Sequence, residues 1–164
     1  MKKILMEVKD YVIIILAVVL IRTFLITPAI VDGASMDDTL KDGELVIINK
    51  LIYNLKDVDR FDIVVLNNEE DDDKIIKRVI GLPNETIKYK DNKVYINDNL
   101  MLCDIEFPDT EDFEAKTKDN EYFVLGDNRG ISKDSRMLGN FKKEDIVGRV
   151  TLRLFPFKKI GLIK

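Results

Sequence analysis

The pattern of apolar and polar residues divides the chain into an apolar N-terminal stretch and a longer body of short alternating segments. Three lysines among the first ten residues precede a continuous apolar run at residues 11–21, which Arg22 interrupts. The run has the length of the apolar region of a cleaved signal peptide, and residues 27–29 offer a poor cleavage site. Alternatively, residues 12–26 form a short transmembrane helix whose Arg22 extends to the interface.

We favour the anchor, because cleavage would remove Arg22 and would end the leader only a few residues before Ser35. Lysines before the run place the N-terminus in the cytoplasm and the remaining chain outside. The sequence therefore predicts a single-pass protein of the cell membrane. Its cytoplasmic tip and transmembrane anchor occupy residues 1–27, and an extracytoplasmic β-rich domain occupies residues 28–164.

The body of the chain has the pattern of β-strands. Its apolar segments are short, rich in β-branched residues and bounded by polar residues or glycine. Asp91 and Asn92 separate two alternating segments and form a good two-residue hairpin turn. No segment of the body shows helical periodicity over three turns. We expect a mostly β, antiparallel, β-barrel-like domain with strands at residues 44–48, 61–66, 74–80, 85–90, 93–97, 122–125 and 146–155.

Two acidic regions interrupt this pattern. Residues 69–73 are consecutive acidic residues, and we predict a solvated loop tip there. A calcium site needs ligands spaced to surround an ion, which a consecutive run does not supply. Residues 104–120 are acid-rich and irregular, and we expect a surface excursion.

Composition narrows the possible chemistry. The formal net charge is −4 and no basic stripe with interleaved aromatic residues is present, which argues against a nucleic-acid partner. Cys103 is the only cysteine, so no intramolecular disulfide is possible. The chain has no histidine, which excludes HExxH zinc sites, Ser-His triads and Cys-His pairs. A carboxylate site for magnesium or calcium stays open.

Ser35 follows the apolar stretch, where the chain would leave a membrane. A serine becomes a nucleophile only when a base takes its proton, and without histidine that base is a lysine, a carboxylate or an N-terminal amine. Burial among apolar residues favours the neutral form that a lysine base requires. Lys77, in the sequence IIKRVI at residues 75–80, is the best candidate. The alternative is that Ser35 is a turn residue and that Lys77 or Arg78 simply faces water.

The sequence GDNRGISKDSR at residues 126–136 follows a predicted strand. One interpretation is a polar loop held by its own Asp–Arg pairs and side-chain turns. In the other interpretation, a hydroxyl of this loop orients the base while Asp134 and Arg136 fix the loop. Composition leaves both interpretations open.

Four sequence blocks occur in order: SMDDTL at residues 35–40, RFDIVV at 60–65, KRVIGLP at 77–83 and GDNRGISKDSR at 126–136. Together they resemble the signature blocks of type I signal peptidases (leader peptidases) in the compact single-anchor form. The segment GRVTLRLFP at residues 148–156 is similar to the last strand of that family. The resemblance therefore extends from the anchor to the C-terminus.

This resemblance implies a Ser-Lys dyad that uses no metal or cofactor. Ser35 corresponds to the nucleophile, and Lys77 to the general base that later protonates the leaving amine. Ser132 corresponds to the hydroxyl that orients the lysine, and Asp134 and Arg136 to the supporting ion pair. The implied substrates are secreted preproteins with small residues before the cut.

In the family, the preprotein binds as an extended strand beside the active site, and two shallow pockets accept small side chains. Alignment makes Val31, Met36, Leu40 and Ile76 candidate pocket walls, with membership of the hydrophobic core as the alternative. The lipid bilayer is the second implied partner. The anchor would hold Ser35 near the membrane surface, where the signal peptide emerges, and so raise the effective concentration of the site.

Three positions depart from the family pattern. Gly33 stands where some members place an additional oxyanion hydroxyl, so we expect main-chain donors, chiefly the Ser35 N–H. Asp38 stands where proline is usual, and Phe61 stands where glycine is usual. A carboxylate of Asp38 close to Lys77 would raise the lysine pKa and oppose the neutral base.

Two rival functions stand beside this prediction. A self-cleaving Ser-Lys protease of the SOS-repressor type has a similar fold, but it carries a DNA-binding or soluble N-terminal region and an internal cleavage site. A catalytically weak relative would bind preproteins without cleaving them, and only Asp38 favours it. The sequence therefore predicts a membrane-anchored serine endopeptidase that removes signal peptides.

Overall fold

The fold consists of short strands with a separate N-terminal helix. The computed structural model describes residues 2–20, 25–69, 72–101 and 110–163. The elements are α1 (Lys2–Leu20), β1 (Ile26–Ile30), β2 (Leu45–Asn49), α2 (Ile52–Leu55), β3 (Ile63–Asn68), β4 (Asp73–Gly81), β5 (Thr86–Lys90), β6 (Lys93–Ile96), β7 (Asn99–Leu100), β8 (Phe113–Lys116), β9 (Glu121–Leu125), α3 (Ser135–Leu138), β10 (Phe141–Lys142), η2 (Lys143–Asp145), β11 (Ile146–Phe155), η3 (Phe157–Lys159) and β12 (Gly161–Leu162).

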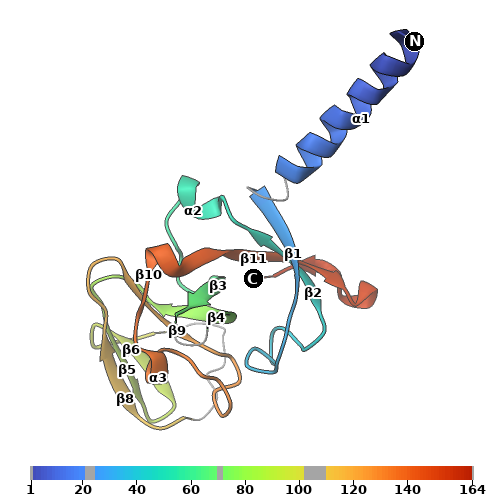
Figure 1. The fold of residues 1–164 in the computed structure, drawn as a ribbon. Helices are drawn as coiled ribbons and strands as arrows, with labels where there is room; N and C mark the ends of the chain where they lie inside the picture. The colour runs from blue at the N-terminus through green and yellow to red at the C-terminus, as the bar shows by residue number, and fades with distance from the viewer. Residues whose placement is uncertain (1, 21–24, 70–71, 102–109, 164) are drawn as a thin grey trace.

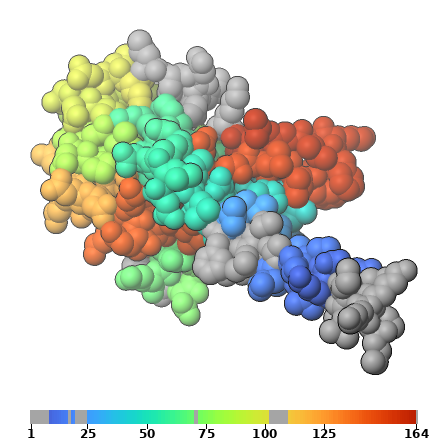
Figure 2. Space-filling model, turned by 90° about the horizontal axis from the view of Figure 1, so that it is seen from above, coloured from blue at the N-terminus to red at the C-terminus, as the bar shows by residue number. Residues whose placement is uncertain are grey.

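The strands form two antiparallel sheets (Figure 1). The larger sheet has the order β1-β2-β11-β3-β4-β9-β10, and β12 pairs with β11. The smaller sheet has the order β7-β6-β5-β8. The expected antiparallel β class is confirmed, but the larger sheet does not close along this path, because β1 and β10 lie at its two ends. Figure 2 shows the C-terminal residues, coloured red, projecting from one side of the body.

The alternation of apolar residues located most of the strands. All seven predicted segments contain a strand, and the last one matches β11 residue for residue. Asp91 and Asn92 have φ values of 50° and 60°, as a hairpin turn of this kind requires. Five strands were not predicted, namely β1, β7, β8, β10 and β12. β1 begins in the residues assigned to the anchor, and β8 lies in the part of the acidic excursion that the structure describes.

The N-terminal helix stands away from the two sheets (Figure 1). α1 spans Lys2–Leu20, and its described apolar side chains from Tyr11 onward are exposed. Among the residues that the structure describes, no helix is both long enough and apolar enough to cross a membrane. Cys103 and Arg22 lie outside the described residues.

Three buried hydrophobic clusters hold the body together. The first joins the segment between β1 and β2 to strands β2, β3 and β11, and it contains the fully buried Met36 and Leu40. The second packs β3 against β4, β9 and β10. The third joins β4 and β9 of the larger sheet to β5 and β6 of the smaller one. Because each buried side chain of this size contributes roughly 1.5–3 kcal/mol, the first cluster firmly fixes the segment that carries Ser35.

Phe61, in the segment before β3, has a backbone conformation that favours glycine. Its φ is 72°, in the left-handed region that costs a residue with a side chain about 1–2 kcal/mol. The Phe61 N–H donates to the Val79 carbonyl over 2.8 Å, and the Phe61 carbonyl accepts from Arg78 Nη1 over 3.1 Å. The ring packs against the third cluster. The glycine that the resemblance leads us to expect here would adopt this conformation without that cost, and in Phe61 the ring contacts offset the strain.

Replacing Phe61 separates these two contributions. Phe61→Ala and Phe61→Gly both lose the ring contacts, but only glycine relieves the left-handed conformation. We expect Phe61→Gly to be more stable than Phe61→Ala by about 1 kcal/mol. Urea unfolding followed by far-UV circular dichroism measures this, because the chain has no tryptophan. A Phe61→Ala variant as stable as the glycine variant would contradict the strain.

Candidate active site

Ser35 lies at the start of a single helical turn between β1 and β2. The N–H groups of Thr39 and Leu40 both donate to the Met36 carbonyl, over 2.8 and 2.6 Å. We call residues 34–40 the nucleophile turn. Met36 and Leu40 anchor it in the first hydrophobic cluster, whereas Ser35 is half-buried. The turn therefore presents the Ser35 hydroxyl from a rigid base.

Lys77, on β4, is hydrogen-bonded to Ser35. Its Nζ lies 2.8 Å from Ser35 Oγ and 3.0 Å from the Ile76 carbonyl oxygen. The residue is only 3% exposed. Burial lowers the pKa of Lys77 below its ordinary value of 10.5, and the charges of Asp134 and Asp127 oppose part of that shift. The predicted serine and lysine therefore come together, with the lysine in surroundings that favour its neutral form.

The segment after β9 packs directly against the nucleophile turn. The Asn128 N–H donates to the Ser35 carbonyl over 3.0 Å. A Cβ atom at Gly126 would lie only 2.6 Å from that same carbonyl oxygen and would overlap the side chain of Ser132. Glycine is therefore required at position 126 for the two segments to approach this closely.

Ser132 lies beside Gly126, and its side chain is buried. The residue is 2% exposed, and its Oγ has no hydrogen-bond partner among the described residues. The structure contains no hydrogen bond between Ser132 and Lys77. The sequence thus brings the predicted hydroxyl next to the dyad, although the contact that would orient the lysine is not made here.

Asp134 and Arg136 form the predicted ion pair. Arg136 Nε lies 2.8 Å from Asp134 Oδ1, and Asp134 is fully buried. Asp134 also caps α3 and accepts from the Gly126 N–H over 3.0 Å. Arg136 in turn donates to the Arg129 carbonyl and to Thr110 Oγ1. The pair therefore fixes the segment that contacts Ser35.

A second buried ion pair was not predicted from the sequence. Arg78 Nε and Nη2 lie 2.9 and 2.8 Å from the two carboxylate oxygens of Asp127. Thr39 Oγ1, at the end of the nucleophile turn, accepts from Arg78 Nη2 and donates to Asp127. The alternative interpretation, in which Lys77 or Arg78 faces water, is wrong, since both are buried. An arginine in an apolar strand was the available signal, because a buried guanidinium stays charged and needs a carboxylate partner.

A cleft of about 230 Å³ opens beside the dyad. Of the four predicted pocket residues, Val31, Met36 and Ile76 line it, whereas Leu40 lies fully buried in the first cluster and does not. Leu40 faces inward because it closes the helical turn that anchors the segment. The cleft is lined by Ala29, Ile30, Val31, Asp32, Gly33, Ser35, Met36, Ile48, Val65, Asp73, Lys74, Ile75, Ile76 and Lys77.

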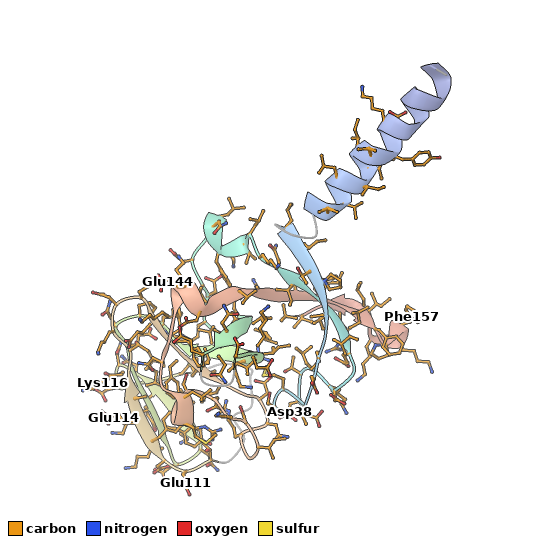
Figure 3. The ribbon with its side chains drawn as sticks, in the orientation of Figure 1. Asp38, Glu111, Glu114, Lys116, Glu144 and Phe157 are labelled. Carbon is orange, nitrogen blue, oxygen red and sulfur yellow. The ribbon has the colours of Figure 1, made fainter. Side chains whose placement is uncertain are left out.

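Three further groups near the site were expected to influence it. Asp38 is exposed at the outer edge of the nucleophile turn (Figure 3), and the carboxylates that act on the pKa of Lys77 are Asp134 and Asp127. The suspected opposition of Asp38 to the neutral base is therefore not supported.

The Gly33 N–H donates to Asp42 Oδ1 over 2.8 Å, whereas no described residue accepts from the Ser35 N–H. In the part of the chain that the structure describes, no His, Cys, Asp or Glu side chains cluster as metal ligands.

Known proteins are similar to this chain in sequence and in fold. The family model "Signal peptidase, peptidase S26" matches residues 4–155. Signal peptidase I S of Bacillus subtilis (strain 168) is 40% identical over 97% of this chain and 93% of its own length, and signal peptidase I of Bacillus amyloliquefaciens is 38% identical over 95% and 90%. The crystal structure of a signal peptidase I from Enterococcus faecalis V583 aligns with a TM-score of 0.53 and 33% identity, covering 58% of this chain and 98% of that one. The chain therefore belongs to the signal peptidase family, peptidase S26.

Proposed function

We propose that this protein is a serine endopeptidase that removes N-terminal signal peptides from exported preproteins, with Ser35 as nucleophile and Lys77 as general base. The single observation that carries the proposal is the 2.8 Å contact between Ser35 Oγ and the buried Nζ of Lys77. The chain belongs to a family of signal peptidases and has no histidine, and Lys77 is the basic side chain that contacts Ser35.

In the first step, neutral Lys77 takes the proton of the Ser35 hydroxyl while Ser35 Oγ forms a bond to the scissile carbonyl carbon. The carbon–nitrogen bond then breaks, and the Lys77 ammonium returns the proton to the leaving amine. Water next attacks the acyl-enzyme, giving one proton to Lys77 as its oxygen bonds to the carbon. Release of Ser35 with that proton regenerates both residues. Lys77 acts in both steps without a net change of charge.

The Ser35 N–H supplies the oxyanion donor in this mechanism. It is a main-chain group with no acceptor in the described part of the chain, next to the oxygen that attacks. Neutral Lys77 has a lone pair for the Ser35 proton and two N–H donors. The Ile76 carbonyl takes one donor, and the unpartnered Ser132 hydroxyl is available for the other. Ser132 is thereby the orienting group, with Asp134 and Arg136 as support.

The preprotein binds as an extended strand between two unpaired strand edges. Val31 directs its N–H and carbonyl toward β2, so Ile30 and Asp32 direct theirs to the open edge. The N–H and carbonyl of Val79 form hydrogen bonds with the segment before β3. Because this direction alternates along a strand, the backbone groups of Lys74 and Ile76 point to the opposite edge of β4, N-terminal to the residues that pair with β9. The four residues with open backbone groups all line the cleft, namely Ile30, Asp32, Lys74 and Ile76. Val31, Met36 and Ile76 add apolar walls suited to small substrate side chains.

Residues 1–27 form the cytoplasmic tip and membrane anchor, and residues 28–164 form the extracytoplasmic peptidase domain. The continuous apolar run at residues 11–21 and the lysines before it support this arrangement. The exposed apolar side chains of α1 need an apolar environment such as the bilayer. The non-cleaving alternative loses its only support, because Asp38 is not among the charges that act on the Lys77 pKa.

Cleavage of a purified preprotein by the detergent-solubilised protein tests the dyad. We expect Ser35→Ala and Lys77→Ala to reduce cleavage at an Ala-x-Ala site by about 10³-fold or more, because the two groups act as a unit. Lys116→Ala is a matched control, since Lys116 is an exposed lysine on the smaller sheet (Figure 3). A folded Lys77→Ala variant that cleaves at the normal rate would refute the proposed base.

The pH dependence of cleavage tests the state of Lys77. The neutral fraction grows as the pH rises through the lowered pKa, so kcat/KM should increase with pH and reach half its maximum below pH 10.5. Asp38→Asn should leave that midpoint unchanged, because Asp38 is exposed and does not act on Lys77. A midpoint at or above 10.5 would contradict the depressed pKa, and a lower midpoint in Asp38→Asn would implicate Asp38.

The membrane arrangement has its own test. The full chain should stay with membranes after alkaline extraction, and protease added to spheroplasts should digest the domain at residues 28–164. Deletion of residues 11–21 should release the protein. Extraction of the intact chain by alkali would rule out the anchor, and protection from external protease would reverse the topology.

A further inference from the structure

The nucleophile turn is held at its far end by a residue on a distant strand. Arg153 on β11 donates through Nη2 to the carbonyl oxygen of Thr39. Thr39 and Ser35 belong to the same helical turn, which closes on the Met36 carbonyl. A displacement of the Thr39 carbonyl therefore moves the Ser35 hydroxyl with it.

A buried carboxylate orients the Arg153 guanidinium. Arg153 Nε lies 2.7 Å from Glu44 Oε2, in an ion-pair contact rather than an aligned hydrogen bond. Glu44 is only 4% exposed, and Lys159 Nζ approaches its other oxygen at 3.9 Å. Burying a carboxylate is unfavourable unless cations compensate it, so Glu44 restrains Arg153 strongly. Glu44 lies after the nucleophile turn in sequence and immediately precedes β2.

The backbone of β11 is irregular on both sides of Arg153. Its register against β2 shifts between Val150 and Leu152 and again between Arg153 and Phe155. β-bulges redirect side chains and occur frequently beside active sites. The two register shifts thus lie on either side of the residue whose side chain reaches Thr39.

We propose that Arg153, oriented by Glu44, is a positioning residue that keeps Ser35 Oγ within hydrogen-bonding distance of Lys77 Nζ. This inference rests on the proposed function of the same two residues. Arg153 does not line the cleft, so it acts on catalysis through the nucleophile turn rather than on substrate binding. Loss of its contact should therefore lower kcat and leave KM nearly unchanged.

Arg149 provides a matched control on the same strand. Arg149 Nε lies 3.0 Å from Asp62 Oδ1, and Asp62 is 4% exposed, like Glu44. The Arg149 side chain is 25% exposed and that of Arg153 17%. This second pair joins β11 to a buried carboxylate without touching the nucleophile turn. Arg149→Gln and Arg153→Gln therefore make the same chemical change with a similar expected loss of stability.

The experiment measures kcat, KM and thermal stability of full-length, detergent-solubilised wild type, Arg153→Gln, Arg153→Lys and Arg149→Gln on one preprotein. We expect Arg153→Gln to lower kcat by roughly 10- to 100-fold with KM within about twofold, as displacement of a reacting group does. Arg153→Lys should recover only part of kcat, because one ammonium cannot reproduce the guanidinium contacts with both Glu44 and Thr39. Arg149→Gln should keep the wild-type kcat.

Equal kcat losses in the two glutamine variants would reduce Arg153 to a structural role and overturn the proposal. A full kcat in Arg153→Gln would overturn it as well. Crystal structures of both variants give an answer that does not depend on turnover. An unchanged 2.8 Å contact between Ser35 and Lys77 in Arg153→Gln would refute positioning. A wild type that cleaves no preprotein would refute the proposed function instead, while the structures would still decide the position of the turn.

Discussion

The arrangement of the site depends on burying one lysine beside a serine. Burial of Lys77 favours the neutral amine, but two carboxylates lie near enough to raise its pKa again. Each of these carboxylates is paired with an arginine of its own, Asp127 with Arg78 and Asp134 with Arg136. The pairs partly cancel the negative charge that Lys77 experiences. They also tie the segment after β9 to β4 and to the nucleophile turn, so the same contacts supply both electrostatics and geometry.

The sequence limited the candidate catalytic groups to a small set and located most of the long strands. Without histidine, the base for Ser35 had to come from a short set of groups, and Lys77 was the lysine embedded in apolar residues. Strands with clear alternation were also predictable, and β11 was located residue for residue. The Asp134–Arg136 pair was predicted from the family resemblance, and its two members lie only two residues apart. Local sequence patterns were therefore enough to locate most of the longer strands.

Contacts between distant segments could not be read from these patterns. β1 is a short strand whose outward residues remain exposed, so its sequence resembles the continuation of the apolar stretch. Arg78 finds Asp127 and Thr39 only when three separate segments meet. The sequence left Leu40 open between a cleft wall and a core residue, and its position at the end of the helical turn places it in the core. Phe61 accepts a positive φ because a cluster formed by two sheets surrounds its ring.

The cleft leaves two strand edges unpaired, and such edges are a hazard because they can pair with any other chain. Here their exposed length is short. Pro28 lies among the outward-facing residues of β1 and has no N–H to donate, while β4 carries the charged residues Asp73 and Lys74 at its open end. Free backbone groups thus remain mainly at Ile30, at Asp32 and at the N–H of Ile76, whose carbonyl already accepts from Lys77. Under the proposed function, an extended chain can complete the sheet only where Ser35 can reach it, so the same few residues would protect the edges and select the cleavage position.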